Sequence, residues 1–167
     1  MNFISKKFIT ATFCMLSLTA SSLIYANERV NNATESTHKI FTPQSMKWSS
    51  GPNSLPKGAQ ITLLEGDPSK AGPFTLRLKF PANYRIPPHW HPSIEHLTII
   101  SGNLYLGMGD KFDVKEAKQL SPGSFGFMPP HINHFAFTRT PTIVQLHGEG
   151  PWGITYINPQ DDPRNRR

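Results

Sequence analysis

The sequence predicts an all-β protein, built as a small antiparallel β-barrel of the jelly-roll kind, and three observations carry this prediction. From Gly58 onward, short runs of alternating apolar and polar residues are separated by glycine and proline, as in strands that bury one face. No segment of 10 or more residues shows the 3.6-residue periodicity of an amphipathic helix. With 167 residues, the chain has room for one domain with a real core.

The individual strands follow from the alternation. In the clearest one, residues 74–80, phenylalanine and leucine occupy every second position, and threonine, arginine and lysine the positions between. Glycine and asparagine at 101–103 have the dihedral preferences of a tight turn, which predicts a hairpin joining strands 95–100 and 104–108. The charged stretch 110–119 is compatible with a short helical turn or with a loop. Further strands are expected at 46–50, 61–64, 124–127, 135–137, 142–147 and 153–157.

The first 26 residues have the organisation of an export signal. Lys6 and Lys7 precede a mostly apolar stretch at 8–18, and small residues lead to a cleavage point after Ala26. A retained membrane anchor is the alternative, but serine and threonine make the stretch too polar for a span of about 20 apolar residues. We therefore expect a protein exported to the bacterial periplasm or secreted, with no membrane anchor after cleavage.

Composition excludes some chemistry and some partners. Cys14 lies inside the export signal and is the chain's one cysteine, so the mature protein is expected to have no disulfide and no thiolate chemistry. The formal charge of +6 falls to +4 without Lys6 and Lys7, and three of the remaining cations lie in the last four residues. No basic stripe is interleaved with aromatic residues, so nucleic acid is not an expected partner.

The expected organisation has four parts. They are the export signal at 1–26, a polar arm at 27–47, the β-barrel at 48–159 and a polar basic tail at 160–167. An arm of this kind can cover the edge strand of a second copy, which makes a homodimer one possible assembly.

Four side chains have the types and the spacing of a metal site built on strands. His89 and His91 are two residues apart, so on a strand they point to the same face. Glu95 follows, and His134 comes from a later strand. Three imidazoles and a carboxylate suit one divalent ion of Mn, Fe, Ni, Cu or Zn, and they leave open the positions that catalysis or ligand capture needs. A polar pocket without a metal is the alternative.

The motifs that contain these residues resemble those of the cupin superfamily. They read His-x-His-x3-Glu-x6-Gly, ending at Gly102, and Gly-x5-Pro-x4-His, ending at His134. The resemblance covers about residues 76–138. The sequence beyond the two motifs is similar to that of small exported bacterial single-domain cupins of unassigned function. It implies a double-stranded β-helix in which His89, His91, Glu95 and His134 bind the metal.

The chain departs from these motifs mainly at two turns. Asn83 and His131 stand where the motifs usually have glycine, and Thr138 replaces a frequent asparagine. Asparagine and histidine tolerate left-handed backbone angles better than most residues, so we expect both turns to be kept.

Further site residues are less determined by the pattern. Gln145 and His147 share one face of a strand. If that face points inward, they line the pocket or hydrogen-bond a ligand imidazole; the sequence leaves inward and outward directions open. Tyr105 and Phe127 are other pocket candidates, although aromatic residues at strand spacing more often belong to the core. Because Glu95 is expected to point inward, the alternation of a strand predicts that its neighbour His96 points outward.

These residues favour a metal-dependent enzyme of dioxygenase, isomerase or lyase type, acting on a small oxygen-rich organic substrate. Glu95 is then the candidate proton acceptor. A non-catalytic periplasmic module that binds or senses a metal or a small ligand is the alternative. A structural role with a vestigial metal site is a third possibility. The sequence has no glycine-rich phosphate loop, serine nucleophile elbow or Cys/His pair.

Overall fold

The structure, a computed structural model, describes residues 38–165. The predicted export signal and most of the predicted arm lie outside the described residues, as do Arg166 and Arg167. All the strands within residues 38–165 belong to one compact unit, Phe41–Arg167. Within residues 38–165, no helix is long and apolar enough to cross a membrane.

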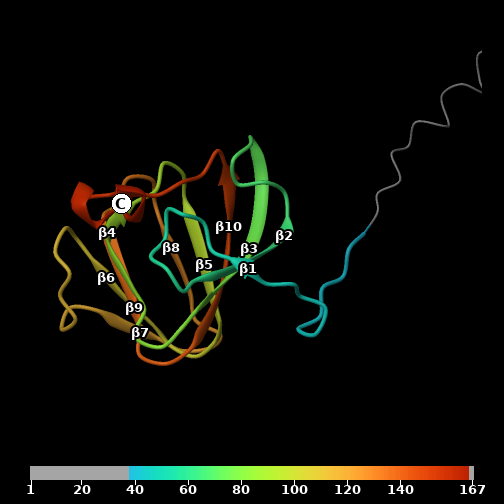
Figure 1. Cartoon of the computed structure of the whole chain (residues 1–167), viewed down its shortest axis with the longest axis horizontal. Helices are drawn as coiled ribbons and strands as arrows, with labels where there is room; N and C mark the ends of the chain where they lie inside the picture. Colours follow the sequence, from blue (N-terminus) through green and yellow to red (C-terminus); the bar gives the residue numbers. More distant parts are fainter. Residues whose placement is uncertain (1–37, 166–167) are drawn as a thin grey trace, which may run out of the picture. The chain divides into compact units, whose positions relative to one another are not determined.

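The described strands form two antiparallel sheets that face each other (Figure 1). The first sheet has the order β1 (Ser49–Ser50), β2 (Gln60–Glu65), β3 (Gly72–Phe80), β10 (Thr142–Gly150), β5 (Glu95–Ser101), β8 (Phe125–Met128). The second has the order β11 (Thr155–Tyr156), β4 (Arg85–Trp90), β9 (His134–Thr138), β6 (Leu104–Met108), β7 (Lys118–Leu120). Two short 3-10 helices follow, η1 (Pro159–Asp161) and η2 (Pro163–Asn165). The predicted all-β class is therefore confirmed.

The core lies between the two sheets, and β3 shows why this sequence forms it. Phe74, Leu76, Leu78 and Phe80 are 1%, 3%, 6% and 2% exposed, and they form the inward row that the alternation predicts. Ile86 on β4 and Leu104 on β6 reach the same core from the opposite sheet. Since burying one such aliphatic or aromatic side chain is worth about 1.5–3 kcal/mol, this row is a main source of stability.

The predicted hairpin at 101–103 is wrong. β5 pairs with β10 and β8, whereas β6 pairs with β9 and β7, so the turn carries the chain from one sheet to the other. Gly102 has a φ of +73°, as the turn residues predict. A Cβ at this position would lie 2.3 Å from the carbonyl oxygen of Pro141. The turn is therefore present, but it joins two sheets rather than two neighbouring strands.

We expect the substitution Gly102→Ala to destabilise the protein by about 2–4 kcal/mol, because it adds left-handed strain to a backbone clash. The matched control is Gly126→Ala on β8, where an added Cβ meets one side-chain atom at 3.9 Å. Urea unfolding followed by circular dichroism measures both variants. Equal stability of the two variants would contradict the role given to the turn.

The charged stretch 110–119 forms a loop and not a helical turn; Lys118 and Gln119 belong to β7. Phe112 from this loop packs on β9, with its ring centroid 4.8 Å from that of Phe135. Every residue of β9 is consequently buried, on the outer face as well as the inner one. His134 therefore begins a strand that is covered on both sides.

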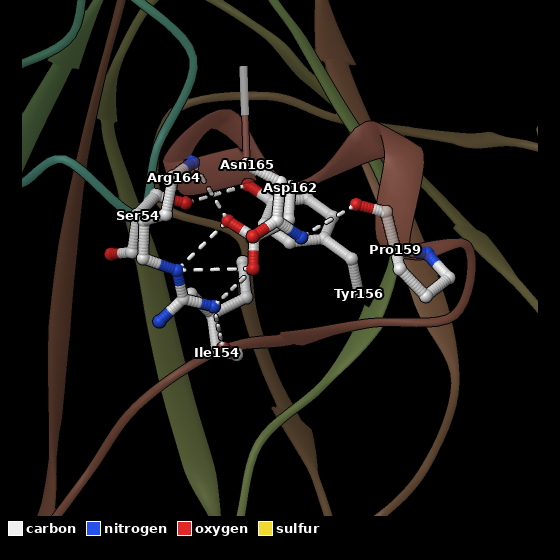
Figure 2. Close-up of polar contacts among 7 residues, drawn as sticks. All are labelled: Ser54, Ile154, Tyr156, Pro159, Asp162, Arg164 and Asn165. Atoms are coloured by element: carbon white, nitrogen blue, oxygen red, sulfur yellow. Dashed lines mark hydrogen bonds and ion pairs between the residues drawn. The ribbon is translucent and has the colours of Figure 1, made fainter. Parts of the chain in front are cut away.

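The last described residues bind to the barrel (Figure 2). The Arg164 guanidinium donates to the Asp162 carboxylate at 2.6 Å and to the carbonyl oxygen of Ile154 at 3.1 Å. The hydrogen bond from Arg164 lowers the pKa of the Asp162 carboxyl group. Most of the described residues expected to be a polar tail thus lie in two 3-10 helices, the first of which begins at Pro159, and Arg164 of the second contacts the chain before β11.

Candidate metal centre

Three histidine side chains meet between the two sheets. His89 lies on β4 and pairs with His134, the first residue of β9. His91 comes one residue after the end of β4. One nitrogen from each ring can serve as a ligand, and these three nitrogens lie within 4.8 Å of one another. The three residues are only 2–4% exposed.

Glu95, the first residue of β5, reaches the same point from the other sheet. Its Oε2 lies 3.5 Å from Nε2 of His91 and 3.3 Å from Nε2 of His134. The carboxylate is buried as well, since the residue is 7% exposed. The structure thus brings together all four residues that the sequence predicted as ligands.

Backbone carbonyl groups fix the orientation and the tautomer of each imidazole. Nδ1 lies 2.7 Å from the Pro87 oxygen in His89, 2.6 Å from the Gly153 oxygen in His91 and 2.9 Å from the Ile132 oxygen in His134. Because a carbonyl oxygen only accepts, each Nδ1 must carry the hydrogen and donate. The Nε2 lone pair of each neutral ring is then left for a metal ion.

One of the histidine nitrogens that could bind a metal lacks a hydrogen-bond partner. Nε2 of His91 is buried and has no hydrogen-bond partner among the described residues. A buried polar atom without a partner costs about 1–3 kcal/mol, and a metal ion would remove that cost. Three imidazole nitrogens beside one carboxylate are also ligands of the type that divalent transition metals prefer. The residues present therefore fit such an ion.

The electrostatics favour the metal-binding forms of His89, His91 and Glu95. Burial, reinforced by the neighbouring His134 and His91, lowers the pKa of His89 to about 3. Burial also lowers the pKa of His91. Burial alone would raise the pKa of Glu95, but the neighbouring histidines His91 and His134 outweigh it, and the pKa is lowered. Neutral imidazoles and an ionised carboxylate are the forms that bind a metal.

The metal-free protein is expected to lose stability as the pH falls. Since the pKa of His89 is about 3 in the folded protein, against an ordinary value of 6.5, the unfolded chain binds the proton first. Stability is thus greatest above pH 6.5, and the loss on reaching pH 3 is on the order of 4 kcal/mol from this group. The lowered pKa of Glu95 changes the stability in the same direction. Its contribution to stability is present above the ordinary pKa of the carboxyl group and is lost as the pH falls through the pKa of the folded protein. Urea unfolding from pH 7.5 to 3.5 measures the slope.

The variant His89→Asn provides the check on this pH dependence. It removes one of the titrations with a lowered pKa, so its stability should depend less on pH than that of the parent protein over the same range. Parallel curves for the two proteins would contradict the assignment to His89.

A cavity of about 180 Å³ lies beside the four predicted ligands, and three of them line it. The Trp152 ring lies in its wall and stacks on His91, with centroids 4.2 Å apart and planes 14° from parallel. Phe74 packs on Trp152 at 5.5 Å. The full lining is Pro52, Ser54, Leu55, Ile61, Pro68, Leu76, Leu78, His89, His91, Glu95, Leu146, Trp152, Gly153 and Ile154.

Residues 51–59, which connect β1 to β2, form one wall of this cavity. The Tyr156 hydroxyl donates to the Ser54 carbonyl oxygen at 2.8 Å (Figure 2). The Tyr84 hydroxyl donates to the carbonyl oxygen of Pro56. Tyr156 on β11 and Tyr84, which directly precedes β4, thus bind the 51–59 segment. Leu55 of this segment lines the cavity.

The four other pocket candidates, Gln145, His147, Tyr105 and Phe127, are not among the residues that line this cavity. Leu146 lines the cavity, so strand alternation turns its neighbours Gln145 and His147 to the outer face. There Gln145 accepts from Arg77 at 3.0 Å, and His147 stacks on His96 at 4.6 Å. Phe127 is 59% exposed on the same sheet. Tyr105 packs on Phe137 and beneath Arg139.

The two substituted turns keep their left-handed backbone, as predicted. Asn83 has a φ of 59° and His131 a φ of 62°. Thr138 supports the first turn, because its hydroxyl donates to the Pro81 carbonyl at 2.7 Å and accepts from the Tyr84 amide at 3.1 Å. Threonine at this position therefore serves the turn that precedes the His89 strand.

Comparison with known proteins places the fold. No protein-family model and no curated protein sequence matches the chain. Among solved structures, it is similar to the polyketide cyclase RemF from Streptomyces resistomycificus, with a TM-score of 0.64 and 16% identity, over 76% of this chain and 90% of that one. It is also similar to an RmlC-like cupin from Shewanella frigidimarina, with a TM-score of 0.52 and 16% identity, over 68% of this chain and 91% of that one.

A third similar structure is the DMSP lyase DddQ from Ruegeria pomeroyi, with a TM-score of 0.56 and 18% identity, over 70% of this chain and 64% of that one. The two facing sheets and the buried histidine cluster define a double-stranded β-helix with a candidate metal centre. The chain has the cupin fold, as its two motifs predicted. Identities this low define the fold and not the reaction.

Proposed function

We propose that this protein is an exported, metal-dependent enzyme of dioxygenase, isomerase or lyase type, which acts on a small organic substrate with oxygen donors. One observation carries the proposal. The imidazoles of His89, His91 and His134, each fixed by a backbone carbonyl, converge beside the Glu95 carboxylate. A cavity for a small molecule adjoins them.

The site residues have three proposed roles: they bind the metal, accept a proton or line the cavity. His89, His91, His134 and Glu95 would hold one ion of Mn, Fe, Ni, Cu or Zn, which supplies a Lewis acid for substrate oxygens. Glu95, whose pKa is lowered by its histidine neighbours against the effect of burial, is ionised and able to accept a proton. Apolar side chains surround the cavity beside the reacting groups.

The test begins with protein loaded separately with each of the five metals. Metal content is measured first, and the loaded proteins are then screened by mass spectrometry against enediols, flavonols, diketones and sugar acids. We expect turnover with at least one metal, and none with metal-free protein or with His89→Ala. One metal ion per chain without turnover of any of these substrate classes would count against the proposal that the protein is an enzyme.

The second candidate is a non-catalytic binding or sensing module for a metal or a small ligand. It is favoured by the cavity lining, in which the only ionisable side chains among the described residues are the predicted ligands His89, His91 and Glu95. A ligand that copurifies and is recovered chemically unchanged would support this candidate. Recovery of a converted product would exclude it.

Export and a homodimeric assembly complete the proposal. The export signal at 1–26 and the polar arm at 27–47 supply the reasons. Cell fractionation with mass spectrometry of the mature N-terminus tests cleavage after Ala26. Light scattering of the mature chain tests the dimer, and a monomeric mass would contradict it.

A further inference from the structure

The lining of the cavity narrows the class of ligand. We propose that the site takes a small molecule with one oxygen-bearing head, which binds the metal, and one apolar body about the size of a single ring. The molecule carries no second charged group. This inference rests on the proposed metal site and specifies the substrate that the site admits.

Away from the metal ligands, the cavity lining is mainly apolar. Aliphatic side chains from several elements surround it: Leu55, Ile61, Leu76, Leu78, Leu146 and Ile154. Apart from His89, His91 and Glu95, the polar side-chain groups among its described lining residues are the Ser54 hydroxyl and the Trp152 indole. Nε1 of Trp152 is itself buried, without a hydrogen-bond partner in residues 38–165. Because Nε1 of Trp152 is buried, a ligand finds few polar partners in the lining away from the metal ligands.

This lining discriminates against ligands that are polar along their whole length. A hydroxyl or amide that enters an apolar wall without a partner costs about 1–3 kcal/mol in proteins, and an unpaired charge costs far more. Among the described residues, no lysine or arginine lines the cavity to balance a second carboxylate. Sugar acids and dicarboxylates are thus disfavoured, and the oxygen-rich substrate predicted from the sequence is narrowed to one with oxygens at one end.

The volume sets the size of the apolar body. The cavity measures about 180 Å³. For comparison, an apolar protein cavity of about 150 Å³ binds benzene. One aromatic ring or a branched chain of similar bulk therefore fills the space beside the metal ligands.

The experiment compares probes that share one metal-binding head. Benzohydroxamate carries a phenyl ring and acetohydroxamate a methyl group, and 4-carboxybenzohydroxamate adds a second charge to the ring. Calorimetric titration into the zinc-loaded full chain gives each affinity, normalised to that of the same probe for aqueous zinc. We expect benzohydroxamate to bind at least about 10-fold more tightly than acetohydroxamate. The added carboxylate should abolish that advantage.

A pair of leucine variants locates the apolar body. Leu55→Asn changes the cavity wall on the 51–59 segment, and Leu63→Asn changes a β2 side chain that is 46% exposed and outside the lining. We expect Leu55→Asn to reduce the ratio of the benzohydroxamate to the acetohydroxamate affinity at least about 3-fold, and Leu63→Asn to leave it unchanged. Acetohydroxamate affinity should stay the same in both variants.

The outcomes separate this inference from the proposed function. Less than one zinc per chain, measured by elemental analysis, would overturn the metal site and the inference together. One zinc per chain with equal normalised affinities for benzohydroxamate and acetohydroxamate would overturn the inference alone. A ratio that falls equally in both leucine variants would also overturn it.

Discussion

Replacing His134 with alanine is expected to lower the affinity for the metal by more than about 100-fold, since changes to the outer partners of ligands already cost about 10–100-fold. The substitution removes one of three converging nitrogens and the nearest histidine nitrogen to Glu95 Oε2, at 3.3 Å. Competition with a chromogenic chelator measures the affinity for zinc, and elemental analysis measures the stoichiometry.

The control for this variant lies three residues earlier in the same segment. His131 is exposed and has a left-handed backbone, so His131→Asn removes an imidazole and keeps a residue that tolerates the turn. Its zinc affinity should equal that of the parent protein. Unchanged affinity in His134→Ala, or an equal loss in both folded variants, would contradict the assigned ligand set.

The second large effect is expected on stability. Phe74 is 1% exposed and packs on Trp152, so Phe74→Ala should lower the free energy of unfolding by about 3–5 kcal/mol. Phe125 is 57% exposed on the outer face of the same sheet, and Phe125→Ala should change it by less than about 0.5 kcal/mol. Urea unfolding at neutral pH, with metal removed, measures both.

The same pair tests whether the core supports the site. Trp152 stacks on His91, so the loss of the Phe74 ring should also alter the near-ultraviolet circular dichroism of the folded protein. Phe125→Ala should leave that spectrum unchanged. Equal destabilisation by the two substitutions would show that the inward row of β3 does not dominate the core.

The strands that could be predicted are those whose signal is local. The alternation of apolar residues in β3 determines its buried face, and the structure confirms it. The turn at Gly102 was also predictable, but its connection was not. Glycine and asparagine define a backbone conformation, whereas the partners of β5 and β6 are decided by pairing with β10 and β9, distant in sequence.

The same distinction between local and long-range signals applies to the candidate site. His89 and His91 were predictable as neighbours because both lie in one short segment, and the motif brought in Glu95 and His134. The direction of His147 was left open by the sequence, although the apolar neighbours Val144 and Leu146 on β10 indicate the inward face. Trp152 was missed as a partner of His91 because its stacking depends on a contact between segments about 60 residues apart.

The carbonyl groups that orient the three imidazoles have a consequence for how this centre tolerates change. The acceptors belong to the main chain at Pro87, Ile132 and Gly153, and a peptide oxygen stays in place whatever side chain its residue carries. Natural variation or protein engineering at these three positions can therefore proceed without erasing an acceptor, provided that the local backbone path is kept. Reshaping the cavity for new ligands need not sacrifice the geometry of the ion's nitrogen donors.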